Sequence, residues 1–171
     1  MFALKKFDLR SGVDTEVEIL LNYSHPHIIG CESTFRTQDH VYLLMEYAAG
    51  GDLYNRIIER RSKRLPFRKY KIKEWFSGVL LAMDFLHKNK IYHRDMKTAN
   101  VLIVAEGDQE VLKICDFGLS KQNEETSKAA NTKVGTRQYM SPEVLRGQEY
   151  KKDADIWSLG CVLFEMWCVL N

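Results

Sequence analysis

Two adjacent glycines, Gly50 and Gly51, divide this sequence into a β-rich part and a mainly helical part. Residues 2–8 and 41–47, which precede the glycines, have the composition of strands. The segments after them carry apolar residues mostly at helical spacing. Strands followed by helices, with a flexible joint between them, predict an α+β fold with two unequal lobes and a cleft. The predicted parts are residues 1–47, a hinge at 48–52, and residues 53–171.

Helices are predicted in four places. Residues 15–23 show an apolar pattern that ends at the His25-Pro26 turn. Asp52 is a favourable N-cap for a helix over 53–61. The longest apolar stripe runs over 74–88 and indicates a helix packed in the core. A last helix begins near Asp155, and the polar stretch between 118 and 135 is expected to be a loop.

The composition excludes several classes of protein. The 171 residues are 45% hydrophobic and 28% charged, which is typical of one globular domain. A net charge of +2 gives no global field that favours nucleic acid or a membrane. The longest apolar stretch, 156–170, is too short to span a bilayer. The first residues lack the charged-then-apolar pattern of a signal peptide, and the four cysteines lack metal-type spacing, so we expect reduced thiols and a cytoplasmic location, with the nucleus possible.

A local excess of positive charge lies between Arg60 and Lys73. The eight basic residues there have two interpretations: a docking patch for an anionic partner, or a solvated loop between two helices. Few aromatic residues alternate with the charges, which favours the solvated loop.

Two short β segments, 101–104 and 111–114, flank a polar turn and predict a hairpin. Asn100 and Asp116 each lie eight residues from Asp108, in the middle of that turn. If the two strands of the hairpin are equally long, Asn100 and Asp116 lie side by side at its open end. Their side-chain oxygens are hard ligands of the kind that suits Mg²⁺. Asp95 lies at the same edge, where a carboxylate can orient an attacking hydroxyl and accept its proton. Lys97 can reach a transferred phosphate and offset its charge.

The segment His93–Asn100, followed by Asp116-Phe117-Gly118, resembles the catalytic loop and the metal-binding motif of eukaryotic-type protein kinases. The resemblance covers essentially the whole chain. It implies a bilobal kinase fold, ATP as phosphoryl donor, Mg²⁺ as metal ion, and protein substrates as acceptors. Lys97 two places after Asp95, together with Gly135-Thr136, favours serine and threonine over tyrosine as acceptor.

The same resemblance implies the contacts to ATP. Residues 2–5 are similar to the strand whose lysine, here Lys5, contacts the α- and β-phosphates, and Glu16 matches the helix glutamate that pairs with it. The strand at 41–47 resembles the one that leads into the hinge. The implied adenosine contacts are Met45 as gatekeeper, the backbone of Glu46 and Ala48, Asp52 at the ribose, and Leu102.

Regulation is also implied by the resemblance. Residues 135–143 are similar to the loop that ends in A-P-E, with Ser141 in place of alanine. A phosphate on Thr132 would be clamped by Arg94 and Lys121, and Thr136 is a further regulatory position. Thr126 and Ser127 are alternative phosphorylation sites. Residues 155–160 resemble the start of the central helix, whose aspartate braces the catalytic loop.

The subfamily features are similar to those of NIMA-related kinases: Lys97-Thr98, Trp75-Phe76, residues 140–143, and the run from Asp155 to Cys161. We expect the chain to be a fragment, because no glycine-rich loop precedes Lys5 and the helices that normally follow the central helix do not appear. Such a chain would be poorly soluble and at best feebly active, with large apolar side chains of its last helix exposed. Two alternatives to an active kinase stay open: a non-catalytic kinase-like binding module, and an inactive truncated fragment. The oligomeric state is not predicted.

Overall fold

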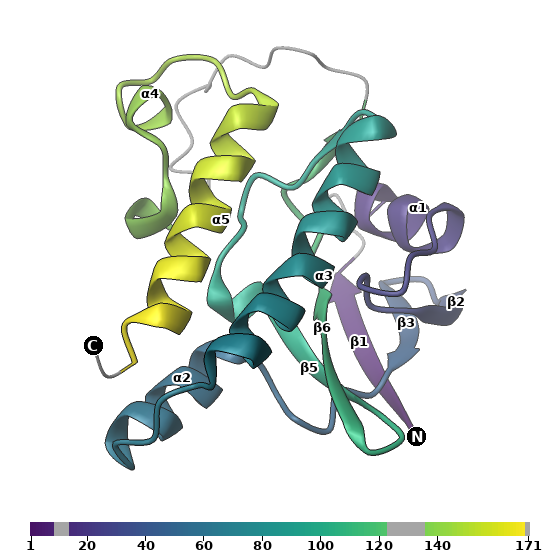
Figure 1. Cartoon of the computed structure of the whole chain (residues 1–171). Coiled ribbons are helices and arrows are strands. Elements are labelled where there is room, and N and C mark those ends of the chain that lie inside the picture. Colours follow the sequence, from purple (N-terminus) through teal and green to yellow (C-terminus); the bar gives the residue numbers. More distant parts are fainter. Residues whose placement is uncertain (9–13, 123–135, 170–171) are drawn as a thin grey trace.

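The computed structural model describes residues 1–8, 14–122 and 136–169 of the chain (Figure 1). Strands β1 (Phe2–Asp8), β2 (Cys31–Arg36) and β3 (His40–Glu46) form an antiparallel sheet in the order β1-β3-β2. Helix α1 (Asp14–Asn22) lies beside this sheet. The remaining elements are mainly helical, so the predicted α+β fold is confirmed.

The alternation of buried and partly exposed side chains along β3 shows on which face of the sheet Lys5 lies. Val41, Leu43 and Met45 are buried, whereas the residues between them are partly exposed. Lys5 is opposite Leu43 in the β1–β3 register. Because opposite residues of an antiparallel pair share a face, Lys5 lies on the inner face of the sheet. The sequence missed β2, whose polar residues give no strand-like alternation.

Helix α2 (Leu53–Ser62) begins as predicted, with the Asp52 carboxylate accepting the Asn55 amide hydrogen at 2.8 Å. Helix α3 (Lys69–Lys88) begins five residues before its predicted start, so part of the basic stretch is helical and the loop between α2 and α3 is short. Helix α5 (Lys152–Trp167) begins near its predicted position. Besides a hairpin over residues 101–114, the described residues form five short elements: β4 (Ile91–Tyr92), η2 (Thr98–Asn100), β7 (Lys121–Gln122), η3 (Arg137–Tyr139) and α4 (Pro142–Leu145).

The hairpin of β5 (Val101–Glu106) and β6 (Gln109–Ile114) corrects the predicted register. Its turn is only two residues long, and Gly107 adopts the positive φ of 60° that such tight turns require. Val101 therefore pairs with Ile114, and Cys115 donates its backbone N–H to the Asn100 carbonyl at 3.0 Å. The prediction that Asn100 lies directly opposite Asp116 was wrong by one residue.

Helix α3 packs against β6 on one side and against α5 on the other (Figure 1). The α5 side chains that face this core include Leu159, Val162 and Met166. Four large side chains of α5 are between 44% and 67% exposed, as expected from its apolar sequence: Ile156, Trp157, Phe164 and Trp167. Within the described ranges, no helix has the length and apolar character needed to cross a bilayer.

A histidine joins the loop before β2 to both α3 and the hairpin. The His27 ring contacts the Leu112 carbonyl through Nδ1 at 2.9 Å. The same ring lies directly over Gly78 in α3, where an added Cβ would overlap the imidazole. Gly78 is therefore required by a close approach of the ring rather than by its backbone conformation.

We expect Gly78→Ala to destabilise the fold by about 1–3 kcal/mol, because a methyl group at this position overpacks the core. Gly160→Ala in α5 is the matched control, since an added Cβ there meets no atom within 4 Å. Alanine at Gly160 should raise the free energy of unfolding by about 0.5–1 kcal/mol through its helix propensity. Urea unfolding of the two variants measures both effects. Equal shifts of the same sign would contradict the close packing of His27 on Gly78.

Candidate active site

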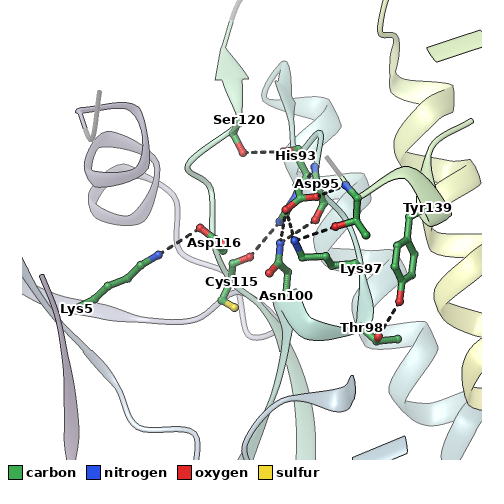
Figure 2. Close-up of polar contacts among 11 residues, drawn as sticks. Lys5, His93, Asp95, Lys97, Thr98, Asn100, Cys115, Asp116, Ser120 and Tyr139 are labelled. Carbon is green, nitrogen blue, oxygen red and sulfur yellow. Dashed lines mark hydrogen bonds and ion pairs between the residues drawn. The ribbon is translucent and has the colours of Figure 1, made fainter. Parts of the chain in front are cut away.

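Three donors hold the Asp95 carboxylate, two from the segment between β4 and β5 and one from Thr136 (Figure 2). Lys97 Nζ lies 2.6 Å from Asp95 Oδ2, and Asn100 Nδ2 donates to the same oxygen at 3.2 Å. The backbone N–H of Thr136 donates to Oδ1 at 3.1 Å. Asp95 keeps 12% of its side chain exposed, so the carboxylate is oriented but still accessible. The structure thus brings Asp95, Lys97 and Asn100 together, and adds Thr136.

A second cluster joins β1, α1 and the segment after β6. Lys5 Nζ lies 2.8 Å from Glu16 Oε1 and 3.3 Å from Asp116 Oδ1. Glu16 is almost fully buried, whereas Asp116 is about half exposed. Burial lowers the pKa of Lys5, but the hydrogen bond and charge of Glu16, with those of Asp116, outweigh it and raise the pKa above its usual 10.5. Lys5 is therefore a fixed positive charge at neutral pH.

The two clusters are joined through Cys115. Its backbone N–H bonds to the Asn100 carbonyl, and its own carbonyl lies 3.1 Å from His93 Nε2. The next residue, Asp116, has a φ of 66°, a left-handed conformation that aspartate tolerates better than most residues. Burial raises the pKa of the Cys115 thiol to about 12, so this cysteine stays protonated and packs as a small apolar residue.

Asn100 and Asp116 have the donor chemistry of a Mg²⁺ site. The Asn100 Nδ2 group is used by the Asp95 carbonyl at 2.8 Å, which leaves Oδ1 as the amide atom able to meet a cation. The half-exposed Asp116 carboxylate supplies a second hard oxygen. Mg²⁺ usually takes one or two protein ligands, completed by water and phosphate oxygens. Across the described residues, no cluster of three or more His, Cys, Asp or Glu side chains gathers around a metal position.

Asp155 supports the catalytic loop from inside the molecule. Its fully buried carboxylate accepts the backbone N–H groups of His93 and Arg94, each at 3.0 Å. The Tyr150 hydroxyl donates to it at 2.6 Å, and His87 Nε2 lies 2.8 Å away. The predicted bracing of the catalytic loop by this aspartate agrees with these contacts. Tyr150 and His87 were missed, because neither belongs to a motif.

The residues expected around the adenosine part of ATP lie at the start of the hairpin and the end of β3. Met45 is buried in β3, and Leu102 forms a backbone bridge with Asp52. Both Asp52 carboxylate oxygens accept hydrogen bonds from Asn55, so Asp52 acts in this structure as the N-cap of α2. The Glu46 N–H donates to the Gly30 carbonyl at 2.9 Å, which leaves Ala48 as the better candidate backbone donor.

An ion-pair cluster behind this segment was missed from the sequence. Lys113 Nζ lies 2.9 Å from Glu46 Oε1 and 3.0 Å from Glu106 Oε1. Burial lowers the pKa of Lys113, but its two carboxylate partners outweigh this and raise the pKa. The sequence contains no signal for this cluster, because a lysine between Leu112 and Ile114 in a predicted strand is equally compatible with solvent exposure.

The structure describes some of the residues that the regulatory predictions name. Thr132 lies outside the described residues, as do Thr126 and Ser127. The backbone of Lys121 pairs with Tyr92 in the β4–β7 ladder. Arg94 has a φ of 68°, and its guanidinium lies 5.6 Å from the centre of the Tyr150 ring. Thr136 contacts Asp95 and Lys97 directly, so its predicted importance has a local structural basis.

Comparisons with known proteins show which family the sequence resembles. The family model described as protein kinase domain matches residues 1–170. The chain is similar to serine/threonine-protein kinase Nek1 of Mus musculus, at 37% identity over 91% of this chain and 12% of that protein. It is 39% identical to serine/threonine-protein kinase Nek11 of Homo sapiens, over 90% of this chain and 23% of that protein. It is 37% identical to serine/threonine-protein kinase nekl-2 of Caenorhabditis elegans, over 91% of this chain and 44% of that protein. The predicted similarity to NIMA-related kinases is confirmed, and the chain spans less than half of each of these relatives.

Proposed function

The chain belongs to the protein kinase domain family, and we propose that the protein containing it transfers the γ-phosphoryl group of ATP to serine and threonine hydroxyls of protein substrates. The observation that carries the proposal is the set of contacts around Asp95, which Lys97, Asn100 and Thr136 hold in one orientation. The relatives named serine/threonine-protein kinase support the choice of acceptor. The proposed lobes are residues 1–47 and 53–171, joined by a hinge at 48–52.

The proposed reaction assigns one task to each group. The substrate hydroxyl oxygen bonds to the γ-phosphorus, while the bond from that phosphorus to the β–γ bridging oxygen breaks and ADP leaves. Asp95 orients the hydroxyl and accepts its proton. Lys97, 2.6 Å from Asp95, offsets negative charge on the transferred group.

The nucleotide is held from the other side of the site. Lys5, oriented by the buried Glu16, is placed to bind the α- and β-phosphates. Asn100 and Asp116 would hold Mg²⁺, which when bound supplies positive charge that balances the phosphate oxygens. The adenosine part would lie against Met45, Ala48 and Leu102. We propose the cytosol or nucleus as the compartment, where ATP and protein substrates are both available.

Lys5→Met should lower kcat/KM for ATP by about a hundredfold or more, because a charged donor to the phosphates is removed. Lys6→Met is the matched control. Lys6 is the next residue of β1, faces away from Glu16, and lies over the Tyr42 ring. Its loss should change kcat/KM by no more than about twofold. The assay uses the protein at its full natural length, with thermal unfolding measured in parallel. Near-wild-type turnover of Lys5→Met would contradict the proposed nucleotide site.

A further inference from the structure

Three segments far apart in the sequence meet at the Thr98 hydroxyl. Thr98 lies in η2, between Lys97 and Asn100, and is fully buried. Its Oγ1 donates to Glu165 Oε2 at 2.8 Å. The same Oγ1 lies 3.0 Å from the Tyr139 hydroxyl, a contact drawn in Figure 2. The Tyr139 hydroxyl donates to the same Glu165 oxygen at 2.7 Å. The three oxygens close a triangle between the catalytic loop, η3 and α5.

The triangle is connected back to the reacting groups through Thr136. The Tyr139 backbone N–H donates to the Thr136 carbonyl at 2.9 Å. Thr136 in turn donates its N–H to Asp95 and accepts a hydrogen bond from Lys97 Nζ at 3.2 Å on its hydroxyl. Since Lys97 and Thr98 are consecutive in the chain, these contacts form a closed ring. Displacement of Tyr139 therefore moves Thr136, and with it the partners of Asp95 and Lys97.

The hydroxyl of Thr98 has no access to water, and its single proton goes to Glu165, which also receives the Tyr139 proton. Glu165 is therefore the group that couples Thr98 to Tyr139. A carboxylate acceptor makes both bonds to Glu165 charge-assisted and stronger than neutral ones. Burial also raises the pKa of Tyr139 to about 12, although Thr98 opposes this shift, so the tyrosine keeps its proton at neutral pH. Tyr139 therefore remains a donor to Glu165 over the physiological range.

We propose that Thr98 is a positioning residue for phosphoryl transfer: through Tyr139 and Glu165, its hydroxyl holds Thr136 against Asp95 and Lys97. The proposal rests on the proposed function, because Asp95 and Lys97 are the groups assigned to the transfer step. The nucleotide contacts of Lys5, Glu16 and Asp116 lie outside this ring, and Asn100 is held separately, by the Asp95 carbonyl and the Cys115 backbone N–H. Loss of the Thr98 hydroxyl should consequently lower kcat and leave the binding of Mg²⁺-ATP unchanged.

The test compares Thr98→Val, which keeps the shape and removes the hydroxyl, with Thr98→Ser, which keeps the hydroxyl. In the protein at its full natural length, Thr98→Val should lower kcat by about ten- to a hundredfold, as expected for a misplaced reacting group. The Kd for Mg²⁺-ATP, measured by calorimetry, should change by no more than about twofold. Thr98→Ser should restore most of the lost kcat. Thr37→Val, the same change in an exposed turn between β2 and β3, is the matched control and should leave kcat at the wild-type value.

Tyr139→Phe keeps the test decisive if Thr98→Val does not fold, and a double-mutant cycle of the two extends the test when both single variants fold. Tyr139→Phe alone should lower kcat with the Kd for Mg²⁺-ATP unchanged, and adding Thr98→Val should cost less than the two single losses combined. Three results would overturn the proposal and leave the proposed function intact. They are a wild-type kcat in Thr98→Val or in Tyr139→Phe, a loss of kcat in Thr98→Ser as large as that in Thr98→Val, and losses of kcat that add in the double variant. A wild-type protein that binds Mg²⁺-ATP and transfers no phosphoryl group would overturn the proposed function, and this inference with it.

Discussion

Asp116→Asn is expected to lower kcat by about a thousandfold or more in the protein at its full natural length. The substitution removes one negative charge and a carboxylate oxygen from the pair proposed to hold Mg²⁺, and it removes a partner 3.3 Å from Lys5 Nζ. Phosphoryl transfer depends strongly on positive charge that balances the phosphate oxygens, so this loss should exceed that of any peripheral contact. Steady-state transfer to a serine peptide at saturating ATP measures kcat.

The fold should survive the same substitution. Asp116 is about half exposed, so asparagine leaves no buried charge there, although among the described residues Lys5 then keeps Glu16 alone as an ion-pair partner. Asp108→Asn, at the opposite end of the hairpin, is the matched control, because Asp108 is exposed and lies in the turn. It should change kcat by no more than about twofold. Near-wild-type turnover of Asp116→Asn would contradict the assignment of this carboxylate.

Asp155→Asn is expected to lower the free energy of unfolding by about 3–5 kcal/mol, because it removes a buried carboxylate that accepts several hydrogen bonds. The Asp155 carboxylate accepts two backbone N–H groups of the catalytic loop and the Tyr150 hydroxyl. The asparagine side chain keeps one oxygen that can accept these hydrogen bonds. Its NH₂ group replaces the second oxygen and, being a donor, cannot accept from the N–H and O–H groups around it. Such a loss is a large fraction of the about 5–15 kcal/mol that stabilises a domain. Urea unfolding of wild type and variant measures it.

The pH dependence of this loss has a definite sign. Burial by itself would raise the pKa of Asp155, but the hydrogen bonds from His87, Tyr150 and the Arg94 backbone, with the charge of His93, hold the pKa below the usual 3.8. A carboxyl group with a lowered folded-state pKa stabilises the fold above its unfolded-state pKa, and this stabilisation is lost as pH falls through the folded-state value. The difference in unfolding free energy between wild type and Asp155→Asn should therefore have its largest value at neutral pH and decrease below about pH 3.8. A difference that grows in acid would contradict the role of this carboxylate.

The grouping of Asp95, Lys97 and Asn100 could be predicted because these residues are close together along the chain. Asp95, Lys97 and Asn100 lie within one short loop, so their spacing alone limits how far apart the side chains can be. The hairpin was predicted from its two apolar arms, but its register was not. The positive φ of Gly107 shortens the turn to two residues and shifts the pairing by one position. A glycine in a polar turn indicates that such a conformation is available, without deciding which register uses it.

The contacts that support the site could not be predicted in the same way. Thr98 and Glu165 are separated by 67 residues in sequence, as are Lys113 and Glu46. Nothing in the local pattern pairs them, since a threonine or a lysine in a short segment is equally compatible with solvent exposure. Their burial is decided by how α5, η2 and the hairpin pack together. Long-range packing therefore determines which polar residues support the active site.

The most direct test of the proposed function is the identity of the residue that receives phosphate. The protein at its full natural length is incubated with Mg²⁺ and ATP labelled at the γ-phosphate, together with peptides that differ only in carrying serine, threonine or tyrosine. Phosphoamino-acid analysis of the products then measures the acceptor. We expect label on serine and threonine from the wild type, and none above background when Asp95 is replaced by asparagine. Label on tyrosine alone, equal transfer by the Asp95→Asn variant, or no transfer by a wild type that binds Mg²⁺-ATP would contradict a Ser/Thr kinase that acts through Asp95.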